Sequence, residues 1–413
     1  MTVSEGNFAG GLDIRPPVAG TRSDAAMESG SESSVNQPAA KVAIVHYWLV
    51  GMRGGEKVLE ALCELFPDAD IYTHVYKPER ISATIRRHRI HTTFIASLPF
   101  ATRLYQAYLL LMPYALEALD LSGYDLVISS ESGPAKGVLT QPGSVHVCYC
   151  HTPMRYLWSG FHEYRRQSGR LTRLAMLFAL SGLRNWDQAS ATRVDHFIAN
   201  SENVAGRIRK YYRRDATVIH PPVDLLEPTL QPAEDFYLYV GQLVAYKHAD
   251  VVVDAFSRMG KKLIVIGRGE QYAALKRTAG PTVTLLGWAD DSTLRDYYAR
   301  CRALIFIADE DFGIVPVEAM SAGRPVIAWA GGGVLETVRD GESGILFAEQ
   351  TAGCLIEAVH QFERVEKSFD PARIAATTIG FAKNRFKQRI SNTIREWMDQ
   401  QQAWSTKRTN SSL

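Results

Sequence analysis

The chain has 413 residues, of which 46% are hydrophobic and 22% charged, so it can bury the cores of two or three domains and is not wholly disordered. Lysine and arginine number 46 against 44 aspartates and glutamates, and this near balance argues against a dedicated nucleic-acid binder, which carries a strong basic excess. The longest uncharged apolar stretch, residues 104–116, is shorter than the roughly 20 residues that a membrane-spanning helix needs.

Residues 1–40 differ in composition from the rest of the chain. They contain six serines, five glycines and three prolines, and their two arginines against five acidic residues give a net charge of −3. A segment without periodic apolar positions cannot bury enough surface to fold, so it is predicted to be a disordered tail. The N-terminus has no basic start followed by an apolar run, and the five cysteines are too few and odd in number for a disulfide framework. We therefore expect a cytoplasmic protein.

The first half of the remaining chain predicts a parallel sheet. An apolar run at residues 41–48 is followed by apolar residues at helical spacing over 58–66. Further strand-like runs occupy residues 125–130, 144–150 and 196–201. Uninterrupted apolar strands separated by helices indicate a sheet covered on both faces, and we assign residues 41–217 to a first Rossmann-like domain.

Prolines mark a boundary before the second half. The sequence VIHPPVD begins a stretch, residues 218–232, that predicts an extended linker. A second Rossmann-like domain is expected over residues 233–385, and then a helix over 386–413 that packs back on the first domain and ends in a frayed tail. The second set of apolar strands is predicted at residues 236–241, 262–267, 283–287, 301–308, 324–330 and 344–347. Two doubly wound α/β halves place the active site in the cleft between them.

The most informative motif is ADEDFGIVPVEAM, at residues 308–320. A strand ends near its start, and a helix opens at the glycine, where free backbone N–H groups attract a phosphate. Glu310 and Glu318 are then placed to accept hydrogen bonds from sugar or ribose hydroxyls, although two solvated carboxylates near a helix start would look the same. The residues whose N–H groups are expected at the phosphate are Phe312, Gly313, Ile314 and Val315.

The spacing Glu310-x7-Glu318 with its intervening Phe-Gly resembles the signature of the retaining glycosyltransferases of family 4. The resemblance extends from about residue 41 to residue 347. It implies the GT-B fold, in which two Rossmann-like domains face each other across a cleft, with acceptor bound in the first and nucleotide sugar in the second. It also implies that Glu310 contacts the transferred sugar and Glu318 holds the ribose. The donor is a substrate, and no cofactor is expected.

A second motif, VGQLVAYKHADVVVDAF at residues 240–256, places Lys247 after the first strand of the second half. A lysine there can neutralise a diphosphate leaving group. The family typically has an arginine directly after the glycine, where this chain has Gln242, which donates hydrogen bonds but supplies no charge. Arg268 can compensate, or it is a solvated surface residue.

Two glycine-rich segments are also expected at the donor. Gly54 and Gly55 follow the first strand and allow a ligand to approach the backbone, although an ordinary turn explains them equally well. Gly332 and Gly333 precede an expected helix, where the family places donor contacts. The string at residues 46–76 resembles a branch that includes O-antigen and exopolysaccharide mannosyltransferases. That branch implies GDP-mannose as the donor.

His151 directly follows the strand that contains Cys148 and Cys150. This cluster has no partner with zinc spacing, so we interpret the cysteines as buried strand residues and expect no metal site. A lone histidine is often structural, but the resemblance implies that His151 contacts the transferring sugar. Three nearby residues are candidates for the acceptor site, with simple packing the alternative for the tryptophan: Arg155, Tyr156 and Trp158.

The first half also has features that suit a membrane surface. Residues 94–119 are apolar with few charges, and residues 85–91 and 163–173 are strongly basic. Apolar and basic surface together can bind anionic lipid, whereas ordinary helix packing with solvated arginines is the alternative. Family members in polysaccharide pathways often use polyprenyl-diphosphate-linked acceptors. We therefore expect an acceptor of this kind and peripheral contact with the cytoplasmic face of an anionic inner membrane.

The sequence thus predicts a retaining, metal-independent hexosyltransferase that moves mannose from GDP-mannose to a lipid-linked glycan in exopolysaccharide or O-antigen-type polysaccharide biosynthesis. Transfer from a UDP-sugar and a sugar-nucleotide epimerase or hydrolase of the same fold are alternatives within enzymes. Because Gln242 replaces a charge, a non-catalytic nucleotide-sugar-binding subunit is a third alternative. The missing GxGxxG after either first strand disfavours a dinucleotide oxidoreductase.

Overall fold

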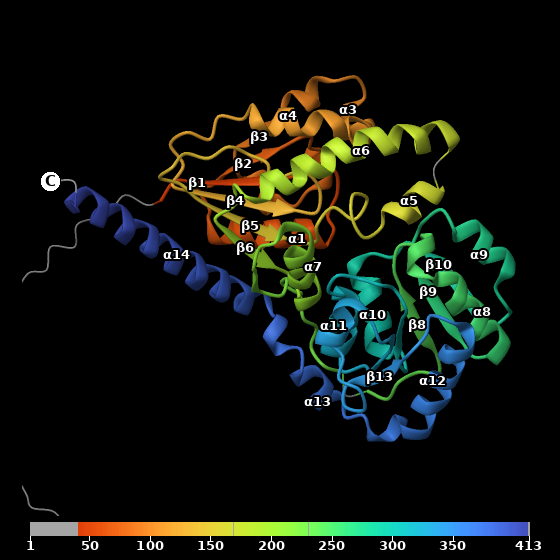
Figure 1. The fold of residues 1–413 in the computed structure, drawn as a ribbon. Coiled ribbons are helices and arrows are strands. Elements are labelled where there is room, and N and C mark those ends of the chain that lie inside the picture. The colour runs from red at the N-terminus through yellow and green to blue at the C-terminus, as the bar shows by residue number, and fades with distance from the viewer. Residues whose placement is uncertain (1–39, 168, 230, 412–413) are drawn as a thin grey trace, which may run out of the picture. The chain divides into compact units, whose positions relative to one another are not determined.

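The computed structural model describes residues 40–167, 169–229 and 231–411. The predicted tail, residues 1–40, lies outside this part except for its last residue. The described chain contains two parallel sheets with helices on their faces (Figure 1). This arrangement confirms the predicted α/β class with two Rossmann-like halves.

The first sheet, within the described residues, has the strand order β3-β2-β1-β4-β5-β6-β7, and all its neighbouring strands are parallel. The order reverses beside β1, so the carboxyl ends of β1 and β4 form the switch point where ligands bind in such sheets. The strands are β1 (Val42–His46), β2 (Asp70–Thr73), β3 (Ile90–Thr92), β4 (Leu126–Glu131), β5 (Val145–Cys150), β6 (His196–Ala199) and β7 (Thr217–Val218).

Helices cover both faces of this sheet. The apolar side of α1 buries Val58, Leu59 and Leu62 against Ile44 of β1, as the helical spacing predicts. The α-helices are α1 (Gly54–Leu65), α2 (Ala83–Arg86), α3 (Ala101–Leu104), α4 (Met112–Glu117), α5 (Phe161–Gln167), α6 (Arg170–Ala191) and α7 (Glu202–Tyr212). Short 3₁₀-helices are η1 (Pro78–Arg80), η2 (Phe94–Ser97) and η3 (Tyr105–Leu111).

The second sheet repeats the same winding with the order β10-β9-β8-β11-β12-β13, again with parallel neighbours. Its strands are β8 (Tyr237–Val240), β9 (Leu263–Ile266), β10 (Val283–Gly287), β11 (Leu304–Phe306), β12 (Val326–Trp329) and β13 (Gly344–Phe347). Its α-helices are α8 (Ala249–Met259), α9 (Tyr272–Thr278), α10 (Asp291–Arg300), α11 (Ile314–Ser321), α12 (Ala352–Val365) and α13 (Pro371–Ala376). The 3₁₀-helices here are η4 (Ala245–Lys247), η5 (Gly332–Glu336), η6 (Glu366–Ser368) and η7 (Ile379–Phe381).

The chain returns to the first half through its last helix, α14 (Lys383–Ser411). Phe386, Ile390 and Ile394 of this helix are buried in the core that also holds β1 and α1. A bridge between Val223 and Ala382 joins the outgoing and returning connections. The two halves are therefore linked by two chain segments that run side by side.

Every strand that the apolar runs predict is present, but β2, β3 and β7 were not predicted. β2 has the sequence DIYT, and its Asp70 is buried because the Tyr124 hydroxyl donates to its carboxylate at 2.5 Å and Arg89 forms an ion pair with it at 2.8 Å. A strand that contains a buried, paired charge is not a continuous apolar run, so the apolar pattern does not predict it. Within the described residues, no helix combines the length and the apolar composition that crossing a membrane requires.

Candidate active site

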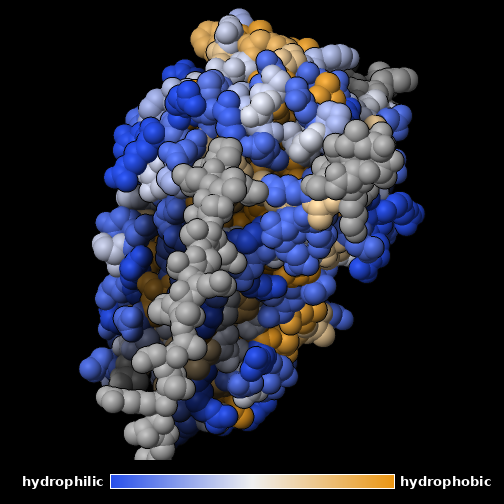
Figure 2. Space-filling model, turned by 90° about the vertical axis from the view of Figure 1, so that its left-hand side faces the viewer, coloured by the Kyte–Doolittle hydropathy of each residue, from blue (hydrophilic) through white to orange (hydrophobic). Residues whose placement is uncertain are grey.

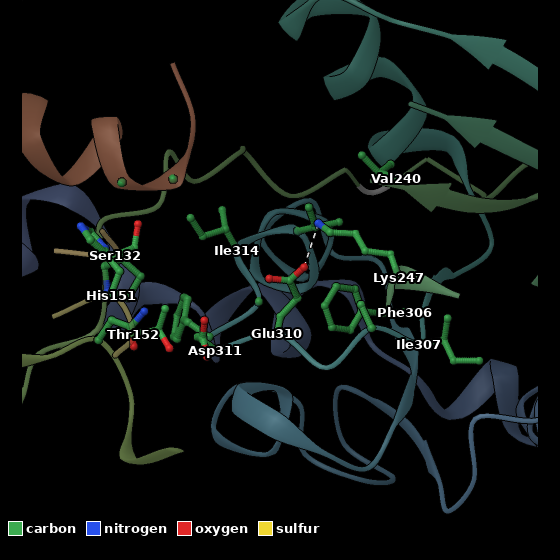
Figure 3. A pocket seen from close by; sticks show the side chains of 18 of the residues that line it. Ser132, His151, Thr152, Val240, Lys247, Phe306, Ile307, Glu310, Asp311 and Ile314 are labelled. Atoms are coloured by element: carbon green, nitrogen blue, oxygen red, sulfur yellow. Dashed lines mark ion pairs between the residues drawn. The ribbon is translucent and has the colours of Figure 1, made fainter. Parts of the chain in front are cut away.

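A cavity of about 300 Å³ lies at the carboxyl ends of the strands of both sheets (Figure 3). His151, Thr152 and Ser132 lie on one side of it and Lys247 on the other, with Glu310 between them. Its size suits a small-molecule ligand. The lining residues are Tyr47, Gly54, Gly55, Ser132, His151, Thr152, Asn200, Pro221, Tyr239, Val240, Lys247, Phe306, Ile307, Ala308, Glu310, Asp311, Phe312, Gly313, Ile314 and Val315.

Two helix N-termini open on this cavity. Gly313 precedes α11 with a φ of 89°, a left-handed conformation that favours glycine, and the next two residues line the cavity. α1 begins at Gly54, and a Cβ atom on Gly54 would lie 3.0 Å from Cδ1 of Ile314, so the two helix starts are in contact. Their unpaired N–H groups and dipoles together favour an anion. The structure thus gathers the predicted residues 312–315 with Gly54 and Gly55.

Lys247 ends the 3₁₀-helix η4 after β8, and its Nζ lies 2.8 Å from Oε1 of Glu310 (Figure 3). Both side chains are largely buried at the cavity. The pair comes from the loops after β8 and β11, which are neighbouring strands of the second sheet. One cation and one carboxylate thus neutralise each other where the sequence predicts a diphosphate and a sugar.

His151 follows β5 and lines the cavity from the first half. Burial, together with the neighbouring His46, lowers its pKa to about 3. The imidazole is therefore neutral near pH 7, so it acts toward a ligand as a neutral hydrogen-bonding group.

Asp311 is held by arginines from the first half. Arg155 Nη2 donates to Asp311 Oδ1 at 2.9 Å and to the backbone oxygen of Asp309 at 3.1 Å. Arg207 of α7 also pairs with Asp311 and lies 3.8 Å from Asp309 Oδ1. The carboxylate raises the pKa of the Arg155 guanidinium against the opposing effect of burial. Arg155 thus forms an ion pair that fixes the acidic loop, residues 309–311, around Glu310. The acceptor contact of Arg155 stays a prediction.

A second connection between the halves involves Glu336 of η5. Its carboxylate accepts the N–H groups of Glu202 and Asn203 at 2.8 and 3.0 Å, at the start of α7. His220 Nε2 lies 3.0 Å from the same carboxylate. These bonds satisfy the free N–H groups of α7, and they lower the pKa of Glu336 although burial opposes this.

Glu318 does not line the main cavity. It faces a smaller cavity of about 80 Å³ between α1, α10 and α11, where the Tyr298 hydroxyl donates to its Oε2 at 2.9 Å. Burial raises the pKa of Glu318 to about 7, and Asp224 and Asp291 add to the effect. The ribose contact that the resemblance implies for Glu318 stays a prediction.

Gln242 and Arg268 are exposed and lie outside the cavity lining. Their loops are joined, because Leu243 donates its backbone N–H to the oxygen of Arg268 at 2.8 Å. The Arg268 guanidinium lies 5.7 Å from the ring centre of Trp288, an exposed aromatic residue after β10. Donor contacts by these two residues stay predictions.

Gly332 and Gly333 do not line the cavity either, and the helix expected after them is the 3₁₀-helix η5, which begins at Gly332. They pack against the backbone of the acidic loop, residues 309–311. Gly333 donates its N–H to the oxygen of Glu310 at 2.9 Å, and a Cβ atom on it would lie 2.3 Å from the oxygen of Asp311. Only glycine fits at that distance, so Gly333 positions the loop. Donor contacts by Gly332 and Gly333 stay predictions.

The remaining acceptor candidates bond within the first half. Trp158 Nε1 donates to the buried carboxylate of Asp187 at 2.7 Å, and its ring stacks on Tyr211 with centres 4.8 Å apart. The Tyr156 hydroxyl lies 2.8 Å from Met154 Sδ. For Trp158, these contacts match the packing alternative that its sequence left open.

Several polar residues at the cavity were missed in the sequence. Tyr47, Ser132 and Asn200 each directly follow a strand, namely β1, β4 and β6. The rule that ligands bind at the carboxyl ends of parallel strands was sufficient to find them. No group of three or more His, Cys, Asp or Glu side chains in the described part of the chain is placed to hold a metal ion.

Comparisons with known proteins give the family of both halves. Residues 52–226 match the family Glycosyltransferase Family 4, and residues 234–363 match Glycosyl transferases group 1. Together these segments span about three quarters of the chain.

Curated relatives match over part of their length. The chain is 28% identical over 182 residues to D-inositol 3-phosphate glycosyltransferase of Segniliparus rotundus, which covers 37% of this chain and 40% of the relative. It is 32% identical over 188 residues to the enzyme of the same name from Mycolicibacterium gilvum, covering 39% and 42%. An uncharacterized glycosyltransferase of Methanocaldococcus jannaschii is 27% identical over 175 residues, covering 41% and 50%. The chain thus spans about half the length, or less, of these relatives.

Solved structures share the fold over nearly their whole length. Sucrose-phosphate synthase from Thermosynechococcus elongatus superposes with a TM-score of 0.66 at 19% identity, covering 87% of this chain and 99% of that one. The lipopolysaccharide outer core galactosyltransferase WaaB gives 0.62 at 16% identity, covering 86% and 99%. Anabaena HepE in complex with UDP-glucose gives 0.62 at 17% identity, with the same coverage. Two matching family models and this shared two-sheet fold identify the chain as a glycosyltransferase of the family 4 type with the GT-B fold.

Proposed function

We propose that this protein transfers a hexose, with retention of configuration, from a nucleoside diphosphate sugar to a glycan acceptor. The observation that carries the proposal is the convergence of Lys247 and the N-termini of α1 and α11 on one cavity that also holds Glu310. These are the groups that a departing diphosphate and a sugar ring require. They lie between two halves that each match a glycosyltransferase family model.

The reaction follows from where the charges lie. The diphosphate binds the N–H groups at residues 313–315 and takes Lys247 as its counter-ion, which releases Glu310 to contact the sugar. The bond between the anomeric carbon and the phosphate oxygen breaks while the acceptor hydroxyl bonds to the same face of the ring. The leaving phosphate oxygen takes the acceptor proton. The backbone dipoles and Lys247 stabilise the developing charge, so we propose that the transfer needs no metal.

GDP-mannose is the donor we propose, supported by the likeness of residues 46–76 to the mannosyltransferase branch. A UDP-sugar is the second candidate, because HepE, which shares the fold, was solved with UDP-glucose. Unfolding experiments with GDP-mannose, UDP-glucose and UDP-galactose distinguish the two. Stabilisation by the UDP-sugars without stabilisation by GDP-mannose would reject the mannose proposal.

For the acceptor we propose a polyprenyl-diphosphate-linked glycan in exopolysaccharide or O-antigen-type biosynthesis, presented at an anionic membrane. Supporting this is an apolar surface on η2, α3, η3 and α4, which lie at the top of Figure 1; apolar residues gather at the top of Figure 2. Phe100 and Tyr114 are 71% and 69% exposed, and Arg103 is exposed among them. The other large exposed members are Phe94, Leu104, Leu110 and Leu111. Apolar side chains with a nearby cation suit an anionic lipid surface.

Vesicle flotation tests this surface. Wild type is expected to float with vesicles that contain anionic lipid and less with neutral vesicles, and Phe100→Ser with Tyr114→Ser is expected to abolish flotation. Trp288→Ser, which removes an exposed aromatic residue of the second half, is the matched control. Equal flotation of the double variant and wild type would contradict the membrane proposal.

Transfer itself is tested with labelled nucleotide sugars and membrane lipid extracts as acceptor. Wild type is expected to form a glycosylated lipid in which the anomeric configuration of the donor is retained, and Glu310→Gln is expected to form none. Product without acceptor would indicate a hydrolase or epimerase. If cells that carry Glu310→Gln assemble their glycan normally, the protein acts instead as a nucleotide-sugar-binding subunit.

A further inference from the structure

Four polar side chains form a buried line that ends at the cavity. His151 Nε2 lies 2.9 Å from Ser130 Oγ, and Ser130 Oγ lies 3.1 Å from His46 Nδ1. On the other side of the His46 ring, Nε2 lies 4.0 Å from Glu56 Oε1. The line therefore runs from Glu56 through His46 and Ser130 to His151, and only His151 lines the cavity.

The fold explains why these groups meet. His46 and Ser130 stand opposite each other in the parallel register of β1 and β4, and His151 donates its backbone N–H to the oxygen of Glu131 at 2.7 Å. Glu56 lies in the first turn of α1, where its Oε2 accepts the N–H of Arg53 at 3.0 Å. Exposure is 2% for Glu56, 1% for His46 and 0% for Ser130, so no solvent competes for these atoms.

The serine hydroxyl restricts the tautomers of both rings. Ser130 has one hydrogen to donate, so when each ring carries a single hydrogen, the hydroxyl donates to one ring nitrogen and accepts an N–H from the other. Among the residues that the structure describes, none forms a hydrogen bond with His46 Nε2, and the nearby charge is the Glu56 carboxylate. The carboxylate attracts a proton on that nitrogen and repels a lone pair. His46 then carries its hydrogen on Nε2, and its Nδ1 accepts the hydrogen of Ser130.

The consequence reaches the cavity. A serine that donates to His46 must accept from His151, which places the His151 hydrogen on Nε2. We propose that Glu56, His46 and Ser130 are positioning residues that fix His151 as the Nε2–H tautomer, with Nδ1 as an acceptor for a hydroxyl of the bound sugar. The use of that acceptor rests on the proposed function, whereas the tautomer itself does not.

Nitrogen NMR of the full chain labelled at histidine tests the tautomer directly. The His151 signals are assigned by their loss in His151→Gln. In wild type without ligand, Nε2 is expected to carry a proton and Nδ1 none. Ser130→Ala is expected to give a mixture of the two tautomers, and Ser130→Thr, which keeps the hydroxyl, to restore the wild-type pattern. Glu56→Gln keeps an oxygen for the Arg53 N–H but removes the charge. It is therefore also expected to give a mixture of the two His151 tautomers.

The adjacent serine provides a matched control. Ser129 Oγ lies 2.9 Å from His146 Nε2, a buried pair of the same chemistry on the opposite face of β4. Ser129→Ala is expected to leave the His151 signals unchanged. A proton on Nδ1 of His151 in wild type, or a His151 pattern that is the same in wild type and Ser130→Ala, would overturn the proposal.

Turnover gives a second readout. Loss of the carboxylate that fixes a histidine tautomer lowers kcat by roughly 10⁴-fold in serine proteases. Here His46 and Ser130 stand between the Glu56 carboxylate and His151, so the effect should be smaller. We expect Ser130→Ala to lower kcat about tenfold or more with little change in donor KM, and Ser130→Thr to recover the wild-type kcat. A fall in donor affinity without a change in kcat would contradict the positioning role. If no nucleotide sugar is turned over at all, the proposed function fails while the NMR result still tests the tautomer.

Discussion

Lys247 and Glu310 form a 2.8 Å ion pair in the cavity, between loops that follow neighbouring strands of the second sheet. The two groups that the family resemblance assigns to diphosphate and sugar are therefore each other's partners in this structure. A bound diphosphate offers Lys247 two negative charges in place of one. The pair holds both side chains at the cavity.

Replacing Lys247 with methionine removes this cation and keeps most of its apolar length. We expect kcat/KM for the nucleotide sugar to fall by about 10²–10³-fold, the size of effect seen when one donor to a developing anion is lost. Lys262→Met, at an exposed lysine 3.3 Å from Asp235, is the control and should leave turnover unchanged. Steady-state kinetics provide the measurement. Turnover of Lys247→Met within twofold of wild type would rule out a diphosphate contact.

Asp311 joins the halves through Arg155 and Arg207, and all three side chains are largely buried. Asp311→Asn removes the carboxylate closest to both guanidinium groups and leaves Arg207 only its 3.8 Å contact with Asp309, so we expect a loss of about 1–3 kcal/mol in the free energy of unfolding. Asp215→Asn is the matched control, since Asp215 pairs with Arg209 but its side chain is 92% exposed. Urea titration measures both. Equal stability of the two variants would show that the ion pairs of Asp311 contribute nothing to the free energy of unfolding.

Glu318 links stability to pH. Burial raises the folded-state pKa of Glu318 to about 7. Below pH 4 the carboxyl is protonated in both the folded and the unfolded state, so it does not lower the free energy of unfolding. As the pH rises toward 7 the unfolded state loses its proton first, and stability falls. Glu318→Gln removes this penalty and should be more stable than wild type at pH 8, by up to about 3 kcal/mol. Urea titrations at pH 5 and pH 8 should give a difference that grows with pH. A difference that is the same at both values would mean that burial does not perturb this carboxyl.

Gly333 packs so close to the backbone of the acidic loop that any side chain at this position would clash with it. Gly333→Ala pushes a methyl group against the backbone of Asp311 and Phe312, so Glu310 must move. We expect kcat to fall at least about tenfold, because a small displacement of a reacting group strongly lowers the reaction rate. Gly353→Ala in α12, where the methyl group meets nothing within 4 Å, should preserve activity. Comparable rates for both variants would remove the support that we assign to Gly333.

A chelator tests the metal-independent reaction. Because Lys247 and the helix N-termini carry the diphosphate charge in this account, transfer should proceed at the same rate with excess EDTA. The measurement is the rate of nucleoside diphosphate release. Loss of activity that Mn²⁺ or Mg²⁺ restores would show that a cation shares this role.

The sequence was sufficient for most of the fold because nearly every buried strand is a continuous apolar run. It missed β2, which begins with the paired Asp70, and the two short strands β3 and β7, which have three and two residues. Short or charge-bearing strands are stabilised by neighbours that only the folded sheet supplies.

The site was predicted where a local motif specifies it, as in residues 310–315. The ion pair of Arg155 was not predicted, because its partner Asp311 is 156 residues away in the sequence. The roles of Ser130 and His46 depend on the register of β1 with β4. Contacts of this kind arise from topology, so no spacing along the chain encodes them.

The central claim is that a nucleotide sugar occupies this cavity with its diphosphate against Lys247. Unfolding of wild type and Lys247→Met with and without GDP-mannose, UDP-glucose and UDP-galactose tests it most directly. We predict that GDP-mannose at 100 times its Kd stabilises wild type by about 2.7 kcal/mol, and that the same concentration stabilises Lys247→Met far less. If no nucleotide sugar stabilises wild type, or if one stabilises both proteins equally, the account is contradicted.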